Sequence, residues 1–201
     1  MSATGRDADH LAHPSNRASM FNLANALTLL RLLLVPLFAW LLLAHGGDDD
    51  GLRWWAAFVF LVAIATDWAD GDLARRQEVV TDVGKIADPI ADKALIGAAL
   101  VALSVLGELP WWVTVVVLAR EIGITALRFV VIRHGVIPAS WGGKVKTTLQ
   151  AVALVLLIVP LDGFWHTTGL VVMYAAVVVT VVTGIDYVLQ AVRMRRDAAR
   201  P

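Results

Sequence analysis

The chain has 201 residues, of which 58% are hydrophobic and 17% are charged. This apolar share is higher than in ordinary soluble domains, so a membrane protein is the first interpretation. Basic and acidic residues balance at 17 each, and the net charge therefore gives no reason to expect a nucleic-acid partner. The absence of cysteine excludes disulfides, thiolate catalysis and cysteine metal sites, which leaves carboxylate and imidazole groups as possible metal ligands.

Hydropathy along the chain predicts a polar lead-in followed by six membrane spans. Residues 1–19 lack the apolar core of a signal peptide, so we expect a flexible cytoplasmic segment there. A spanning helix needs about 20 mostly apolar residues, and the second and third spans reach this length only with the aspartate-bearing segments beside them. The six expected spans cover roughly 24–44, 54–73, 86–106, 111–132, 145–160 and 168–188.

Basic residues fall in alternate loops, as they do in proteins whose positive loops face the cytoplasm. The loops on the opposite side contain almost no basic residue except Arg53 at a helix edge. We therefore expect an all-α, multi-pass integral membrane protein of the cell membrane with both termini in the cytoplasm. A six-helix domain over 20–192 would be followed by a basic cytoplasmic tail over 193–201. The basic residues of the cytoplasmic side would be Arg6, Arg17, Arg75, Arg76, Lys85, Arg133, Lys144, Arg193, Arg195, Arg196 and Arg200.

Tryptophans are expected near the outer boundary of the membrane, where amphipathic aromatic rings are enriched. Those that fall there are Trp40, Trp54, Trp55, Trp111, Trp112 and Trp165. On the same topology, the aspartates of the second and third spans lie at the cytoplasmic end.

The end of the second span carries a stripe of acidic and small residues. Asp67, Asp70, Gly71, Ala74 and Arg75 stand at i, i+3, i+4, i+7 and i+8, so they share one helical face. The two small residues leave room for a ligand to approach the backbone, and the arginine can meet a phosphate.

A second acidic stripe opens the third span. Gly84, Asp88 and Asp92 stand at i, i+4 and i+8, and Pro89 either starts that helix or kinks it. Four carboxylates facing one another across two helices would repel strongly unless cations lay among them. Hard oxygen ligands favour Mg²⁺, Mn²⁺ or Ca²⁺. The alternative is a solvated helix end whose acids pair with nearby basic residues, namely Arg75, Arg76, Lys85 and Lys93.

The two stripes together match the signature of a known enzyme family. The pattern Asp67-x-x-Asp70-Gly71-x-x-Ala74-Arg75, then eight residues, then Gly84-x-x-x-Asp88-x-x-x-Asp92 agrees in every fixed position with the CDP-alcohol phosphotransferases, which the chain therefore resembles. The resemblance implies a six-helix membrane fold, usually a homodimer, with two Mg²⁺ or Mn²⁺ ions and a cytidine diphosphate pocket at the cytoplasmic end. It also implies roles for single residues: Asp67, Asp70 and Asp88 as metal ligands, Asp92 as a ligand and general base, and Gly71, Ala74 and Arg75 as the wall of the pocket.

Further motifs resemble one branch of that family, the phosphatidylglycerophosphate synthases. The segment Asn25-x-Leu27-Thr28-x-x-Arg31 resembles the one that precedes their catalytic helix, with Ala24 in place of a usual proline, and it adds Asn25 and Thr28 to the expected CDP pocket. Two later blocks also resemble these synthases: Arg120-Glu121-Ile122 with Leu127-Arg128, and Trp141-x-Gly143-Lys144-x-Lys146-Thr147-Thr148-x-Gln150. The resemblance implies transfer of a phosphatidyl group from CDP-diacylglycerol to glycerol 3-phosphate.

The charged residues of the later blocks agree with a phosphorylated acceptor. An arginine inside a span is costly unless it meets an anion or a carboxylate, so Arg120 and Arg128 are candidate ligands of the acceptor phosphate. Lys144 and Lys146 are further candidate ligands of that phosphate, at the cytoplasmic mouth of the expected site. The alternatives are an ion pair of Arg120 with Glu121 or Asp186, and ordinary positive-inside topology for the two lysines. Arg31 is either a structural partner of one of the acids or a nucleotide contact.

Rival functions stay open from the sequence. Within the family the rivals are a phosphatidylinositol phosphate synthase and a cardiolipin-type synthase. A membrane prenyltransferase also clamps a diphosphate through Mg²⁺, but its aspartate spacing differs. A cation transporter also keeps acids in helices, although its sites tend to lie near the membrane midplane between internal repeats, and no repeat is visible here.

Overall fold

The computed structural model describes the backbone of residues 15–77, 82–131 and 141–198, and the side chains of 29–66, 93–127 and 143–193. The described backbone is helical and contains no strand. Its elements are α1 (Ser15–Leu43), the 3₁₀ helix η1 (Ala44–Gly47), α2 (Asp50–Gln77), α3 (Asp82–Val105), α4 (Trp111–Val131), α5 (Trp141–Ile158) and α6 (Phe164–Ala198).

Each of the six segments that hydropathy predicts is helical in the structure. The largest differences lie at the two ends of the chain. Helix α1 begins at Ser15, inside the segment expected to precede the first span, and α6 continues to Ala198, into the expected basic tail. The hydropathy pattern does not detect these extensions because they are polar. A helix that has already formed can nevertheless add residues at either end, since each new residue continues an existing turn.

Two stretches of the described helices are long and apolar enough to cross a membrane, Leu29–Gly47 and Phe164–Arg193. Large apolar side chains on the outer faces of several helices, such as Leu33, Ile122 and Val178, are more than half exposed. A soluble monomer rarely exposes so much apolar surface. The core contains many alanines beside larger residues, which is typical of helices that pack closely in lipid. Both features are consistent with a membrane protein.

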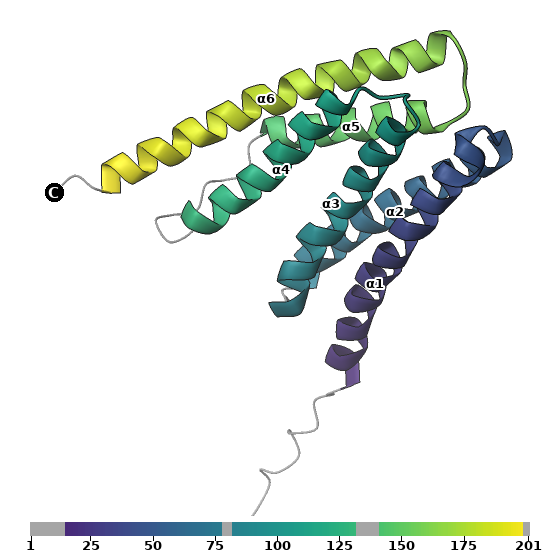
Figure 1. Cartoon of the computed structure of the whole chain (residues 1–201). Helices are drawn as coiled ribbons and strands as arrows, with labels where there is room; N and C mark the ends of the chain where they lie inside the picture. Colours follow the sequence, from purple (N-terminus) through teal and green to yellow (C-terminus); the bar gives the residue numbers. More distant parts are fainter. Residues whose placement is uncertain (1–14, 78–81, 132–140, 199–201) are drawn as a thin grey trace, which may run out of the picture.

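The helices pack in two groups that share the core (Figure 1). Helix α1 lies against α2 and α3, α5 runs along α6, and α4 packs on α6 and α3. The buried centre includes Phe38 of α1, Phe60 of α2, Leu100 of α3, Leu154 of α5 and Met173 of α6. One apolar core therefore holds helices from both ends of the chain in a single bundle.

The connections α1–α2, α3–α4 and α5–α6 meet at one end of this bundle, which we call the Arg53 end. The Arg53 side chain on α2 donates hydrogen bonds to the carbonyl of Gly47, to the carboxylate of Glu108 and to the carbonyls of Leu157 and Ile158. These acceptors belong to the three connections or to the helix turn beside them. The chain therefore alternates in direction as the sequence predicts, because every second connection lies at the same end.

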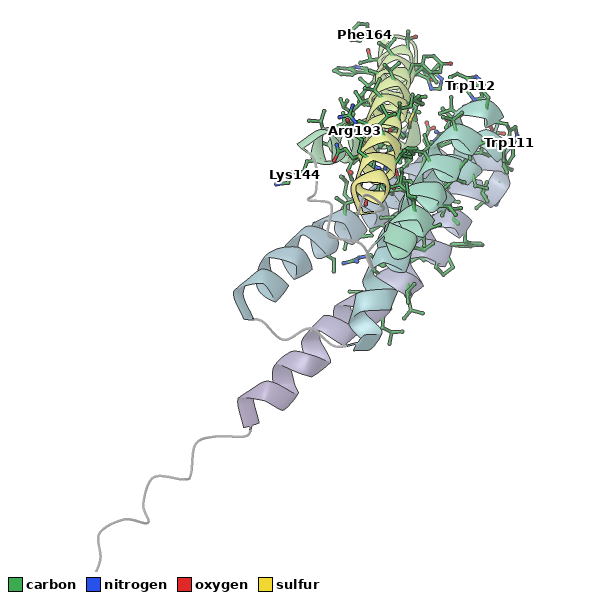
Figure 2. All side chains as sticks on the ribbon, turned by 90° about the vertical axis from the view of Figure 1, so that its left-hand side faces the viewer. Trp111, Trp112, Lys144, Phe164 and Arg193 are labelled. Atoms are coloured by element: carbon green, nitrogen blue, oxygen red, sulfur yellow. The ribbon has the colours of Figure 1, made fainter. Side chains whose placement is uncertain are left out.

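Exposed aromatic residues collect near the Arg53 end. The predicted boundary tryptophans, Trp40, Trp54, Trp55, Trp111, Trp112 and Trp165, are all about half exposed or more, and Phe164 is exposed beside them. Figure 2 shows Trp111, Trp112 and Phe164 toward one end of the bundle and Lys144 away from them. This separation of the exposed aromatic residues from Lys144 is what the sequence predicts for the two membrane boundaries.

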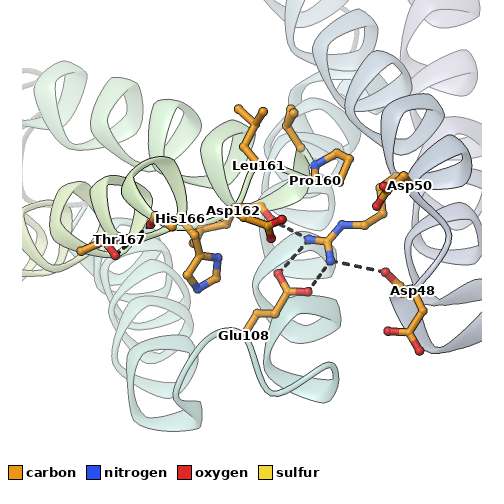
Figure 3. Close-up of a pocket in the computed structure, with 13 residues that line it drawn as sticks. Asp48, Asp50, Glu108, Pro160, Leu161, Asp162, His166 and Thr167 are labelled. Atoms are coloured by element: carbon orange, nitrogen blue, oxygen red, sulfur yellow. Dashed lines mark hydrogen bonds and ion pairs between the residues drawn. The ribbon is translucent and has the colours of Figure 1, made fainter.

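A pocket of about 560 Å³ opens at the Arg53 end. Figure 3 shows Asp48, Asp50, Glu108, Asp162 and His166 around it. It lies at the ends of α2 and α3 opposite to those that carry the acidic stripes. In spite of its acidic lining, no three acidic or histidine side chains of the described residues come together there in a way that could hold a metal ion.

Candidate functional site

The acidic stripes lie on two consecutive helices that contact each other. Asp67 and Asp70 lie in the last part of α2, and Asp88 and Asp92 lie in the first half of α3. Because the backbone is helical at all four positions, each pair shares one face of its helix, as the spacing predicts. The side chains of these residues lie outside the described part of the chain, and their role as metal ligands stays a prediction. The same holds for the other predicted site residues Asn25, Thr28, Gly71, Ala74, Arg75 and Arg128.

The chemistry of these stripes fits a divalent metal. Their predicted ligands, Asp67, Asp70, Asp88 and Asp92, are all carboxylates, the donors that Mg²⁺ and Mn²⁺ prefer. Helical spacing on two adjoining elements presents two acids from each helix. The residues therefore suit Mg²⁺ or Mn²⁺ in number and kind.

The described part of the structure contains a cluster of charged side chains around Glu121 of α4. Its carboxylate oxygen Oε1 accepts a hydrogen bond from Nη1 of Arg120 at 3.0 Å and another from Nζ of Lys146. Arg120 and Glu121 belong to α4, whereas Lys146 comes from α5. One carboxylate oxygen thus joins two cations from two helices.

A third cation reaches the same turn of α4 from α3. Nζ of Lys93 donates to the hydroxyl of Thr125 and, at 3.4 Å, to the backbone carbonyl of Glu121. Thr125 in turn donates to that carbonyl at 2.7 Å. Because Lys93 directly follows Asp92 in α3, this contact places the cluster at the level of α3 where its acidic stripe ends. We call Lys93, Arg120, Glu121 and Lys146 the Glu121 cluster.

Helix α6 forms one wall of the Glu121 cluster. Nη2 of Arg120 donates to the hydroxyl of Thr183 at 3.2 Å. The next residue, Gly184, leaves space for the arginine stem, since a Cβ there would stand 3.2 Å from Arg120 Cγ and 3.4 Å from its Nε. That Nε is buried and has no hydrogen-bond partner among the described residues. Arg120 therefore keeps a donor that its described neighbours do not use.

The structure separates the two lysines that the sequence treats alike. Lys146 is 6% exposed and joins the Glu121 cluster, whereas Lys144 is exposed at the surface. One turn further along α5, the buried amide of Gln150 donates to Thr180 of α6 at 3.1 Å. Gln150, which the sequence motif includes, thus links α5 to α6 just beyond the cluster.

The structure decides the partner of Arg120 and shows where Arg31 lies. Arg120 does pair with Glu121, but Asp186 instead accepts a hydrogen bond from Gln190 at 2.7 Å. Arg31 of α1 is 1% exposed, so it lies inside the bundle rather than at its surface. This burial is compatible with either of the roles considered for Arg31.

Sequence reasoning treats Lys93 only as a possible partner of the acids, and Glu121 as part of a motif and as a possible partner of Arg120. The structure places both in the Glu121 cluster, whose members also contact Thr125, Thr183 and Gly184, which the sequence does not single out. The signal for Lys93 and Glu121 is their charge inside an apolar helix, which is costly without a partner. The threonines and the glycine carry no such signal, because small residues are common wherever membrane helices pack.

Comparisons with known proteins cover most of the chain. A family model described as CDP-alcohol phosphatidyltransferase matches residues 21–182. A protein of Mycobacterium tuberculosis named probable phosphatidylglycerophosphate synthase is 55% identical over 89% of this chain and 86% of its own length. Proteins named CDP-diacylglycerol–glycerol-3-phosphate 3-phosphatidyltransferase from Bacillus subtilis and Escherichia coli K12 are 36% and 37% identical, over 84% and 85% of this chain and 94% and 95% of their own lengths. The motifs, the helical fold and these matches agree: the chain belongs to the CDP-alcohol phosphatidyltransferase family.

Proposed function

We propose that this protein transfers the phosphatidyl group of CDP-diacylglycerol to glycerol 3-phosphate, giving phosphatidylglycerophosphate and CMP in phospholipid biosynthesis. The observation that carries the proposal is the 55% identity to a probable phosphatidylglycerophosphate synthase over 89% of the chain. Matches at lower identity to the named transferases of two other bacteria support the same reaction.

The acceptor assignment has independent support from the Glu121 cluster. Within the described residues of the cluster there are three cations and one carboxylate: Arg120 and Lys146 contact the carboxylate of Glu121, and Lys93 contacts its backbone carbonyl. A phosphorylated acceptor supplies an anion that this excess of positive charge among the described residues would bind. An uncharged alcohol would not. We therefore assign Arg120 and Lys146 to the acceptor phosphate, with Lys144 at the exposed mouth and Arg128 further along α4.

The proposed reaction is a direct displacement on phosphorus. Asp92 takes the proton of the glycerol 3-phosphate 1-hydroxyl, whose oxygen forms a bond to the phosphorus that bears diacylglycerol. The bond from that phosphorus to the CMP oxygen breaks, and CMP leaves. Asp67, Asp70, Asp88 and Asp92 would hold two Mg²⁺ or Mn²⁺ ions, which when bound polarise the diphosphate and neutralise the leaving group. Asn25, Thr28, Gly71, Ala74 and Arg75 would bind the cytidine diphosphate.

The membrane arrangement that we propose has six spans, both termini in the cytoplasm and the acidic stripes at the cytoplasmic end. The lipid substrate would keep its acyl chains in the bilayer while its headgroup enters the bundle, and the protein would function as a homodimer in the cell membrane. The exposed aromatic residues at the Arg53 end and the basic residues in the opposite loops support this orientation.

The experiment that tests the function is an acceptor panel with the purified protein in lipid vesicles. CDP-diacylglycerol and Mg²⁺ are supplied with radiolabelled glycerol 3-phosphate, inositol phosphate or phosphatidylglycerol, and the labelled lipid and CMP are measured. We expect both products only with glycerol 3-phosphate and only with the metal. Incorporation of inositol phosphate or phosphatidylglycerol instead would assign one of the rival synthases, and no CMP release with any acceptor would contradict a phosphatidyltransferase.

A further inference from the structure

We propose that Glu121 is a positioning residue that assembles Lys93, Arg120 and Lys146 into one receptor for the phosphate monoester of the acceptor. This inference rests on the proposed function, to which it adds two residues and a reason for selecting a phosphorylated acceptor. Glu121 itself does not contact the substrate in this scheme. It acts through the cations that it holds.

The geometry of the carboxylate supports the positioning role. Its Oε1 accepts from Arg120 of α4 and from Lys146 of α5, so it fixes two cationic groups from different helices within hydrogen-bond distance of one atom. Without that carboxylate, the two positive groups would repel each other at short range in a part of the bundle that is largely shielded from water. The side chains of Lys146 and Arg120 are only 8% and 15% exposed, so solvent screens this repulsion poorly.

Lys93 completes the receptor from a third helix. Its Nζ is held by the Glu121 carbonyl and the Thr125 hydroxyl, one turn apart on α4, and not by the carboxylate. This leaves one of its three N–H donors without a described partner. Lys93 also directly follows Asp92, the proposed base. A phosphate held at Lys93 would therefore lie at nearly the same level along α3 as Asp92, since successive residues of a helix rise by only about 1.5 Å.

Charge and donor capacity point to a dianion. The described side chains of the cluster include three cations and one carboxylate, which leaves an excess of two positive charges among them. A phosphate monoester carries a charge of about −1.5 to −2 near pH 7, which matches that excess. Lys146 uses one of its three donors in the described contacts, and Arg120 Nε has no described partner. The cluster thus retains N–H groups for the phosphate oxygens.

The test compares Glu121→Gln with Glu108→Gln, a matched loss of charge in the ion pair with Arg53 at the opposite end of the bundle. Apparent KM values for glycerol 3-phosphate and for CDP-diacylglycerol are measured with each protein in vesicles. We expect E121Q to raise the KM for glycerol 3-phosphate about tenfold, the size of effect that follows when a buried charged group loses its partner. The KM for CDP-diacylglycerol should stay within about twofold, and E108Q should change neither value by more than that.

Three further variants keep the inference testable if E121Q does not fold. Lys93→Met should raise the KM for glycerol 3-phosphate, and Lys93→Arg should recover most of the wild-type value because it restores the cation. Glu121→Asp, which keeps the charge on a shorter stem, should fall between wild type and E121Q. A merely structural role would not predict this selective shift of one KM or its recovery by a cation.

The outcomes separate the inference from the function. If the wild-type protein makes no labelled lipid from glycerol 3-phosphate, the proposed function fails. If it does, but E121Q and K93M leave the KM for glycerol 3-phosphate unchanged or raise both KM values equally, the receptor inference alone is overturned.

Discussion

The guanidinium of Arg53 and the carboxylate of Glu108, 55 residues apart in sequence, form a two-contact ion pair at the end of the bundle away from the acidic stripes. The same guanidinium donates to the carbonyls of Leu157 at 2.7 Å and Ile158 at 3.0 Å. These carbonyls lie in the last turn of α5, where intrahelical partners are missing. The Arg53 side chain therefore forms hydrogen bonds with all three connections at this end of the bundle.

Loss of Arg53 should cost more stability than loss of Glu108. We expect Arg53→Met to lower the free energy of unfolding by about 3 kcal/mol, because it leaves a carboxylate and two helix-end carbonyls unsatisfied. Glu108→Gln should cost about 1–2 kcal/mol, because the carbonyl contacts remain. Thermal unfolding in detergent measures both. Equal losses would indicate that the carbonyl contacts contribute little.

The Arg53 contribution should not vary with pH in the usual assay range. The hydrogen bond from Arg53 to Glu108 raises the pKa of the guanidinium above its ordinary value, and this outweighs burial, which lowers it. A group whose pKa is raised by folding stabilises fully below its unfolded-state pKa and loses that effect only as the pH rises through the folded value. The stability difference between wild type and Arg53→Met should therefore be flat from about pH 6 to about pH 9. A difference that shrinks with rising pH in this window would contradict the expected protonation of Arg53.

A side chain at position 184 should displace the side chain of Arg120. Gly184→Ala adds a Cβ 3.2 Å from Arg120 Cγ, whereas Gly123→Ala on α4 meets nothing within 4 Å. Both changes gain about 1 kcal/mol of helix propensity, so the pair isolates the steric effect. We expect G184A to raise the KM for glycerol 3-phosphate about threefold or more and G123A to leave it unchanged. Kinetics with varied glycerol 3-phosphate at saturating CDP-diacylglycerol measure the effect, and equal KM values for the two variants would show that Arg120 can shift without loss.

The buried and the exposed lysine of α5 should differ in their response to salt. Lys146→Met removes a cation from inside the Glu121 cluster, so its KM for glycerol 3-phosphate should stay raised at every ionic strength. Lys144→Met removes an exposed charge whose steering effect is screened once the Debye length falls to about 3 Å, near 1 M salt. The ratio of variant to wild-type KM, measured across a salt series, distinguishes them. The assignment of Lys144 to steering would be wrong if its ratio did not fall with salt.

Asp92→Asn should separate metal binding from catalysis. The amide keeps one oxygen that can ligate a metal but cannot accept the proton of the attacking hydroxyl, so we expect kcat to fall by about 10²–10⁴. Binding of Mn²⁺, followed by electron paramagnetic resonance, should weaken much less than in Asp67→Asn. Loss of Mn²⁺ binding and of activity in the same proportion in D92N would count against the base role.

The positions of the four aspartates on α2 and α3 can be predicted from the sequence. Helix spacing is a local property of the backbone, so the places of Asp67, Asp70, Asp88 and Asp92 along two consecutive helices follow directly from the order of residues. The same reasoning predicts the alternation of the chain, since loops of opposite composition fall on opposite sides. The apolar pattern does not predict where α1 begins or where α6 ends, because polar residues extend both helices there.

The amino-acid sequence by itself determined the family, the helical class, the acidic stripes and the candidates for the acceptor phosphate, because each depends on residue type and spacing within one segment. Only the tertiary structure decided that Lys146 is buried while Lys144 is exposed, that Glu121 joins Arg120 to Lys146, and that Arg53 fastens three connections. Those relationships link residues on different helices, and how α3, α4, α5 and α6 turn toward one another depends on how their side chains pack. Spacing along a single helix carries no information about that rotation.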